Sequence, residues 1–141
     1  MSRHGYVEDG CDEYPLALWR GAVTSAITGK RGQAFLRELV AALDALPDKV
    51  LIKDALVADG SFCAIGSVGA ARGMDMAHLD PYYPEAIADA FGIAPALVKE
   101  IEWVNDEYYA ADPAGRWQLV RDWAVRNTRE AQRQSAAVIA P

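Results

Sequence analysis

Apolar residues recur every three or four positions along most of the chain, which is the period of an amphipathic helix. The first two predicted helices span 16–27 and 33–46, and their apolar stripes consist of Leu16, Trp19, Val23 and Ile27 in the first and Phe35, Leu39, Leu43 and Leu46 in the second. Pro47 ends the second helix, because proline has no backbone N–H to donate. Since the link 29–32 is short, we expect the two helices to pack as an antiparallel hairpin.

The middle of the chain carries weaker signals. Segment 49–57 begins with three apolar residues that fit a short strand, but its end fits a helical turn equally well, and helix is the favoured interpretation. Segment 62–71 contains Gly66 and Gly69 among small and apolar residues. It predicts a thin helix that neighbours can approach closely, although each glycine costs about 1 kcal/mol relative to alanine.

Prolines mark helix starts in the second half of the chain. Proline suits the first helical position, where its missing N–H would have no intrahelical partner, and aspartate is a good N-cap. The chain contains Asp80-Pro81, Ala94-Pro95 and Asp112-Pro113. Together with the apolar periodicity, these signals predict helices over 84–91, 95–106 and 113–128.

The segment between the helices at 84–91 and 95–106 resembles a helix-turn-helix corner. Gly92 can adopt the left-handed conformation that ends the first helix, and Ile93 can fill the corner. Val98 and Ile101 then seat the second helix on the first. The sequence therefore predicts a mainly α, compact bundle of five to seven helices with a helix-turn-helix-like corner.

Composition adds the domain limits. The chain of 141 residues is 52% hydrophobic and 24% charged, which is enough for one core without a disulfide. We expect a polar N-terminal arm over 1–15, a single helical domain over 16–128 and a C-terminal tail over 129–141. The two cysteines, Cys11 and Cys63, imply neither a disulfide nor a metal site. No signal peptide or membrane span is recognisable, so the expected compartment is the cytoplasm and no membrane partner is expected.

Charge is distributed unevenly along the chain. The net charge is −6, and the segment 75–112 has nine acidic residues against one basic residue, Lys99. We interpret the acids at the end of the helix 95–106 as an outer, partner-binding face with two neighbouring tyrosines: Glu100, Glu102, Asp106, Glu107, Tyr108 and Tyr109. Such a face would bring carboxylates close to phosphates, so direct DNA reading by this helix is disfavoured.

Other candidate chemistry is sparse. Lys30 and Arg31 at the start of a helix could contact an anion or a nucleic acid, although the glycines around them do not make a P-loop. His4 and His78 have no nucleophile or carboxylate pair at a motif spacing, and Cys63 lies among apolar residues typical of a core. We therefore assign no catalytic residues, no metal ligands and no cofactor.

Three stretches of the chain resemble a family of short proteins encoded by tailed phages and prophages. They are Trp19-Arg20-Gly21-Ala22-Val23 with the run from Gly29 to Leu39, then the run from Phe91 through Ile101 to Glu107, and then Arg116-Trp117 with Arg121-Asp122-Trp123. The similarity covers about 19–127. It implies a phage accessory protein and transfers no activity to named residues.

The leading functional hypothesis is a non-enzymatic accessory protein that binds a host protein or ribonucleoprotein complex and inhibits host defence, as anti-CRISPR proteins do. Carboxylates at helical spacing can mimic phosphates and steer a protein towards a basic groove. The first alternative is a helix-turn-helix-type DNA-binding regulator that uses Lys30, Arg31 and the arginines of the last helix. The second is a small enzyme of unknown reaction. Basic and acidic faces on one molecule also leave a homodimer open.

Overall fold

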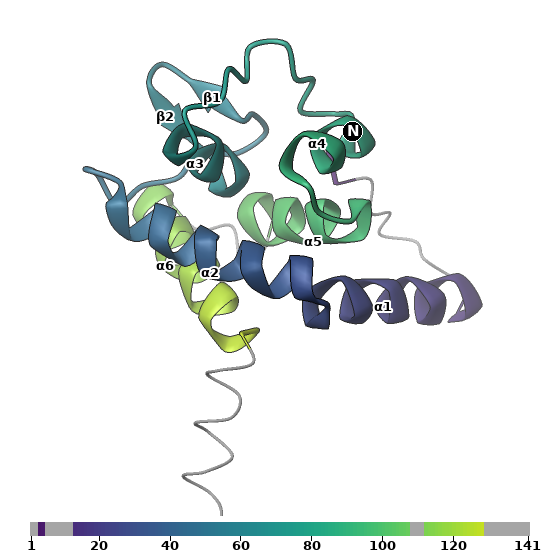
Figure 1. The fold of residues 1–141 in the computed structure, drawn as a ribbon. Coiled ribbons are helices and arrows are strands. Elements are labelled where there is room, and N and C mark those ends of the chain that lie inside the picture. Colours follow the sequence, from purple (N-terminus) through teal and green to yellow (C-terminus); the bar gives the residue numbers. More distant parts are fainter. Residues whose placement is uncertain (1–2, 5–12, 108–111, 129–141) are drawn as a thin grey trace, which may run out of the picture.

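The computed structural model describes residues 3–4, 13–107 and 112–128. Six helices and one two-stranded antiparallel sheet lie within this part of the chain (Figure 1). Their bounds are α1 Glu13–Thr28, α2 Lys30–Ala45, β1 Val57–Ala58, β2 Ser61–Phe62, α3 Ala64–Ala71, α4 Pro84–Phe91, α5 Pro95–Asp106 and α6 Pro113–Arg126. The prediction of a mainly α-helical bundle is confirmed.

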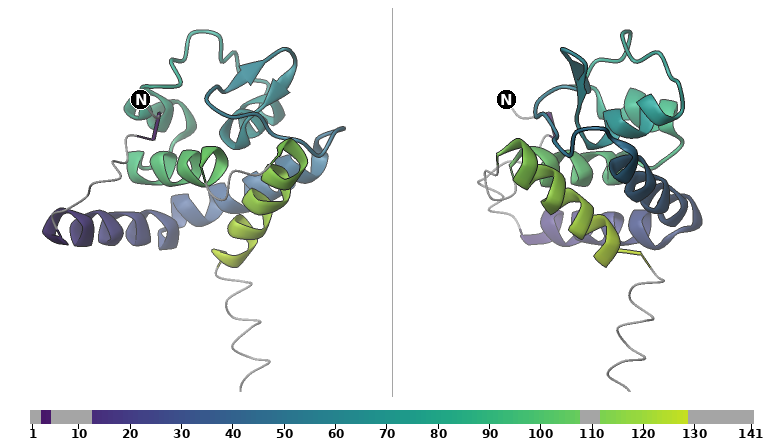
Figure 2. Two further views of the ribbon diagram at one scale, coloured as in Figure 1. Left: turned by 180° about the vertical axis from the view of Figure 1, so that it is seen from behind. Right: turned by 90° about the vertical axis from the view of Figure 1, so that its left-hand side faces the viewer.

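Helix α5 is the centre of the bundle. It contacts α1, α3, α4 and α6, while α2 packs against both α3 and α6 on the other side of the core (Figures 1 and 2). The core side chains contributed by these helices include Leu36, Leu39, Ile65, Leu97 and Ile101, which are fully buried. A helix with neighbours on several sides has little surface left for solvent, and this position governs the environment of every charged residue on α5.

The helix-turn-helix-like corner has the predicted geometry. Gly92 ends α4 with φ 74° and ψ 32°, the left-handed conformation that glycine adopts without strain. Ile93 is buried at the corner, and Val98 and Ile101 are fully buried between α5 and its neighbours. Pro95 occupies the first position of α5, as expected. Helix α4 begins at Pro84, whereas the predicted start signal Asp80-Pro81 lies in the preceding turn, where Asp80 accepts the backbone N–H of Tyr82.

Two predictions about the first half of the domain are wrong. Helix α1 begins at Glu13, inside the segment assigned to a polar arm, and Arg3 and His4 are buried. Helices α1 and α2 do not form an antiparallel hairpin but follow one another end to end (Figure 1). The reason is that Gly29 alone separates them, with φ −70° and ψ 165°, and one residue bends the chain but does not reverse it.

Gly32 is required where α2 meets α1. A Cβ at this position would overlap the carbonyl oxygen of Ala26, so the first turn of α2 could not lie against the last turn of α1. The Gln33 amide fixes the same junction by donating a hydrogen bond to the carbonyl of Ile27 at 2.8 Å.

We expect Gly32→Ala to lower the free energy of unfolding by about 2–3 kcal/mol, because either the junction or the core must shift to make room for the methyl group. Gly21→Ala is the matched control: nothing lies within 4 Å of a Cβ there, and the change should stabilise α1 by up to about 1 kcal/mol. Urea unfolding of both variants measures the difference. Equal stability of the two variants would contradict the close packing described here.

The segment 49–57 is not helical, which corrects the favoured interpretation. It is a loop without regular secondary structure that bends over 53–56 and leads into a hairpin in which Val57 pairs with Phe62 and Ala58 with Ser61. Asp59 and Gly60 form the two-residue turn with φ values of 51° and 77°, the backbone that an Asp-Gly hairpin turn requires. The hairpin lies beside α3, which is the thin helix predicted over 62–71.

Candidate functional site

The predicted acidic face of α5 is largely buried. The exposed fractions of Glu100, Glu102 and Asp106 are 5%, 0% and 8%, whereas Glu107 is exposed. The prediction that all four carboxylates form an outer surface is therefore wrong. Its physical cause is the central position of α5, combined with cations from distant segments that neutralise the buried acids. Tyr108 and Tyr109 lie outside the described residues.

Arg3 is the cation at the centre of this buried cluster. Its Nε and Nη2 donate to the two Asp106 oxygens at 2.6 and 2.8 Å, so the guanidinium and the carboxylate form a two-point pair. The same Nε lies 3.2 Å from Glu102 Oε2, and Nη1 lies 3.6 Å from Cys63 Sγ. We call the surroundings of this guanidinium, made by Cys63, Glu102 and Asp106, the arginine slot.

Asparagine and backbone groups hold the Asp106 carboxylate in place. Asp106 Oδ1 accepts hydrogen bonds from the Asn105 side-chain amide at 2.7 Å and from the backbone N–H of Asp54 at 3.3 Å. Asn105 also donates to the carbonyl of Ile52 and accepts from the N–H of Ala64, both at 2.9 Å. The end of α5 is thus bound to the segment before β1 and to the first turn of α3.

One guanidinium cannot fully compensate two buried carboxylates. Burial raises the pKa of Glu102 to about 8, and the nearby Asp106 charge adds to the effect against the opposing influence of Arg3 and Lys99. Burial would also raise the pKa of Asp106, but the hydrogen bonds from Arg3 and Asn105 and the Arg3 charge hold it below its usual value. Asp106 is therefore the ionised partner of Arg3, and Glu102 keeps its proton at neutral pH.

The remaining predicted acids have separate partners. Arg20 on α1 donates to both Glu100 oxygens, at 2.9 and 3.3 Å, and so connects α1 to α5. The Glu107 carboxylate lies 3.1 Å from His4 Nε2. Two of the predicted partner-binding residues, Glu100 and Asp106, are therefore internal ion-pair partners, and Glu107 lies at the edge of the arginine slot.

The predicted anion-contact residues lie at the surface, at the start of α2. Lys30 is exposed, and Arg31 lies at the α2 N-terminus with its Nη1 3.5 Å from the Gly92 carbonyl. On α6, Arg116 is buried and donates to the carbonyl of Leu51, and Arg121 pairs with Asp44. Nothing in the structure tests anion binding by Lys30 and Arg31.

The burial of α5 bears directly on the DNA-binding alternative. A recognition helix must present long polar side chains to the major groove. In α5 the exposed or half-exposed positions are Pro95, Ala96, Lys99 and Trp103, and Lys99 lies over the Trp19 ring at 5.2 Å. The corner therefore has the backbone geometry of a helix-turn-helix but its second helix lacks a free reading face.

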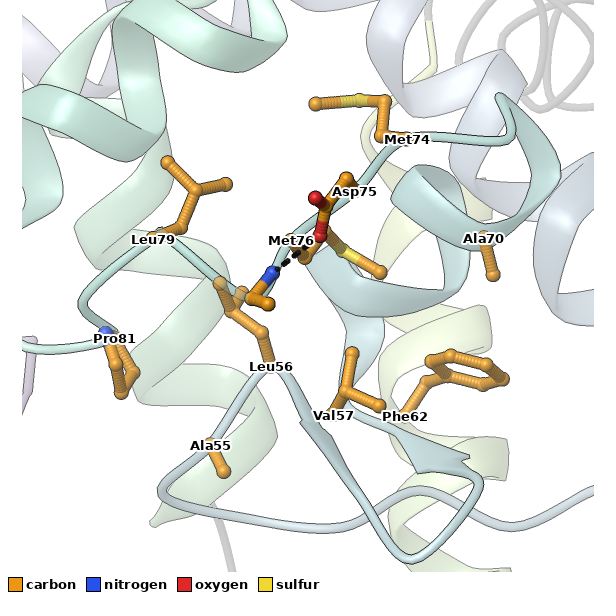
Figure 3. Close-up of a pocket in the computed structure, with 11 residues that line it drawn as sticks. Ala55, Leu56, Val57, Phe62, Ala70, Met74, Asp75, Met76, Leu79 and Pro81 are labelled. Carbon is orange, nitrogen blue, oxygen red and sulfur yellow. Dashed lines mark hydrogen bonds between the residues drawn. The ribbon is translucent and has the colours of Figure 1, made fainter.

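A groove that the sequence analysis did not anticipate lies between the hairpin, α3 and the loop 72–83. Its volume is about 620 Å³, and Figure 3 shows residues of the hairpin on one side and of the loop on the other. The lining residues are Ala55, Leu56, Val57, Phe62, Ala70, Met74, Asp75, Met76, Ala77, Leu79 and Pro81. Among the described large apolar residues, the exposed ones are Val57, Tyr82 and Tyr83, of which Val57 lines the groove and Tyr82 follows the lining residue Pro81.

Two acidic residues make up what we call the rim of the groove: Asp75 is a lining residue, and Asp80 lies between the lining residues Leu79 and Pro81. Both are exposed, and each caps its own turn by accepting a backbone N–H, from Ala77 at 3.0 Å and from Tyr82 at 2.9 Å. Across 54–85 the sequence has five acidic residues and one basic residue, Arg72, which is paired with Glu38 at 2.7 Å. The only local signals for this site were apolar residues without helical period in 72–83, which sequence reasoning alone treats as loop.

Further tests of chemistry concern metals, membranes and known proteins. No group of three or more His, Cys, Asp or Glu side chains within the described residues is arranged to hold a metal ion. No helix in the same part of the chain is both long and apolar enough to cross a membrane. Comparison of the chain with protein-family models, curated proteins and solved structures found no match. The resemblance to phage proteins stays a prediction.

Proposed function

We propose that this chain is a non-catalytic binding protein whose groove receives an apolar segment of another protein with basic residues at its ends. The observation that carries the proposal is a groove lined mainly by apolar side chains, of which Val57 is exposed and Phe62, Met74 and Leu79 are partly exposed. An exposed apolar patch with a polar rim is typical of a protein interaction site, and a volume of about 620 Å³ is within the range of ligand-binding pockets.

The chemistry of the lining determines what the groove would accept. Leu56, Val57, Phe62 and Leu79 offer apolar surface, and Met74 and Met76 are flexible side chains that adapt to different apolar partners. The carboxylates of Asp75 and Asp80 at the rim favour lysine or arginine in the partner segment and disfavour acids. The expected ligand is therefore an apolar stretch between basic residues.

The phage resemblance supplies a biological setting for the proposal. In that setting the partner is a host protein or a ribonucleoprotein complex, and occupation of the groove is the step that inhibits it. The acids proposed to face the partner are Asp75 and Asp80 at the rim of the groove, in place of the α5 acids, which are largely buried. The DNA-binding alternative gains no support from a buried α5, and no described cluster supports the enzyme alternative.

The proposal is tested with two labelled peptides that share an isoleucine and leucine core. One peptide carries lysines at both ends and the other carries glutamates, and fluorescence anisotropy measures their affinities. We expect the lysine peptide to bind at least about tenfold more tightly and to weaken as salt is added, because opposite charges attract across the rim. Equal affinities for the two peptides would overturn the charge argument.

Substitutions then locate the binding site. The double variant Asp75→Asn with Asp80→Asn removes the rim charge but keeps the oxygen that caps each turn. Its affinity for the lysine peptide should be about 3- to 10-fold lower than that of the parent protein. Val57→Asp places a charge in the exposed wall and should abolish binding of both peptides. Ala41→Asp, at an exposed position of α2, is the control with unchanged affinity. Undiminished binding by the Val57→Asp protein would exclude the groove.

A further inference from the structure

The arginine slot is built by residues that do not need Arg3 to orient them. The Asp106 carboxylate is held by Asn105 and by the backbone N–H of Asp54, and Asn105 is itself fixed by Ile52 and Ala64. All of these residues come from the segment 52–106, whereas Arg3 is 103 residues from Asp106 in the sequence. A site oriented in advance can bind a guanidinium that is not part of the same chain.

The slot also has more acceptor capacity than Arg3 uses. Two carboxylates face one guanidinium, and neither Glu102 oxygen accepts a hydrogen bond from a described residue. A buried carboxylate group without donors favours any cation that can reach it. Burial of Glu102 raises its pKa to about 8, and the charge of the neighbouring Asp106 acts in the same direction.

The described part of the N-terminal segment is held by polar contacts. Arg3 contacts Asp106, Glu102 and Cys63, and His4 lies next to the exposed Glu107. Neither residue is part of the apolar core cluster. Breaking a buried ion pair generally costs less free energy than unfolding a whole domain, so local release of Arg3 and His4 does not require global unfolding.

We propose that the arginine slot is a guanidinium-binding site, filled by Arg3 in the structure described here and able to accept an arginine side chain of another polypeptide after Arg3 and His4 are released. This inference is independent of the groove and of its proposed ligand. The slot selects arginine over lysine, because the planar guanidinium reaches both Asp106 oxygens at once and still contacts Glu102.

The labelling rate of the Cys63 thiol tests release of the segment. Cys63 is buried and lies beside Arg3, so a thiol reagent reaches it after the slot opens; Cys11→Ser removes the other thiol. In the protein that keeps Arg3, we expect the labelling rate of Cys63 to stay constant as small amounts of urea are added, which is the behaviour of local opening. A rate that follows the full urea dependence of global unfolding would show that Arg3 is a fixed part of the core and would overturn the proposal.

Acceptance of an external arginine is tested with Arg3→Ala. Labelling of Cys63 should become roughly 100- to 1,000-fold faster in this variant, and a peptide with the sequence of residues 1–5 should slow it again. The same peptide with glutamine or lysine in place of the arginine should not. Calorimetric titration of the variant with the three peptides measures binding directly, and absence of binding by the arginine peptide would refute the site.

A fourth peptide distinguishes the source of the arginine. It carries arginine between glycines and serines, unlike residues 1–5. Protection of Cys63 by both arginine peptides supports a site for partner proteins in general. Protection only by the peptide of residues 1–5 supports exchange of N-terminal segments between two copies of this chain.

Discussion

Arg3→Ala is expected to lower the free energy of unfolding by about 3–5 kcal/mol, the usual effect of removing one partner from a buried ion pair. The variant leaves Asp106 and Glu102 beside one another without the guanidinium that contacts both carboxylates. Asn105 and Asp54 still donate hydrogen bonds to Asp106, but they carry no positive charge. Urea unfolding monitored by tryptophan fluorescence measures the change.

Arg37→Ala is the matched control for this prediction. Arg37 is exposed on α2, and its removal should change stability by no more than about 0.5 kcal/mol. Arg3→Lys separates charge from shape, because lysine restores a cation but cannot make the two-point pair. We expect the free energy of unfolding of Arg3→Lys to lie between those of Arg3→Ala and the parent protein. A loss below about 1 kcal/mol for Arg3→Ala would mean that the N-terminal segment contributes little to the fold.

Glu102→Gln should abolish a pH-dependent loss of stability in the range from about 4.5 to about 8. The pKa of Glu102 is raised from 4.5 to about 8 in the folded protein, so within this range the folded state keeps a proton that the unfolded state releases. The stabilising effect is complete below the unfolded-state pKa and is lost as pH rises through the folded-state pKa. Each pH unit in this range therefore removes about 1.4 kcal/mol.

The test is a set of urea unfolding curves from pH 4.5 to 9. The variant and the parent protein should be similarly stable at pH 4.5, and the variant should be more stable by roughly 3–5 kcal/mol at pH 9. Glu85→Gln on the exposed side of α4 is the control and should preserve the slope of the parent. If the free energy of unfolding depended on pH in the same way for the parent protein and for Glu102→Gln, a protonated, buried Glu102 would be contradicted.

Other acids act in a different pH range and do not obscure this result. The pKa values of Glu38 and Asp44 are lowered by hydrogen bonds from Arg72 and Arg121, and that of Asp106 is lowered mainly by Arg3. Groups with lowered pKa values stabilise the folded state above their unfolded-state pKa and lose this contribution as pH falls through the folded value. Their effect lies at the acidic end, below the range assigned to Glu102.

The α4–α5 corner could be predicted in detail because its determinants are local. Pro84 and Pro95 fix the helix starts, Gly92 supplies the left-handed residue, and the apolar spacing places Val98 and Ile101 in the core. The hairpin turn at Asp59-Gly60 also has a local signal. The hairpin itself could not be predicted, because each strand has only two residues, too few to show the alternating pattern of a strand.

The state of the α5 acids could not be predicted in the same way. A carboxylate at helical spacing looks the same in sequence whether it faces water or a distant arginine, and the partner of Asp106 is 103 residues away. The groove is a similar case, since its walls come from the hairpin, α3 and a loop that have no common periodicity. Both sites are products of long-range packing.

The helical class, the proline-marked starts of α5 and α6 and the thin α3 follow from local sequence signals, because turn chemistry and apolar period act over a few neighbouring residues. The central place of α5, the buried acidic slot filled by Arg3 and the acid-rimmed groove beside the hairpin depend instead on the packing of distant segments. Burial sets the energy of a charge, and burial depends on which segments meet in space.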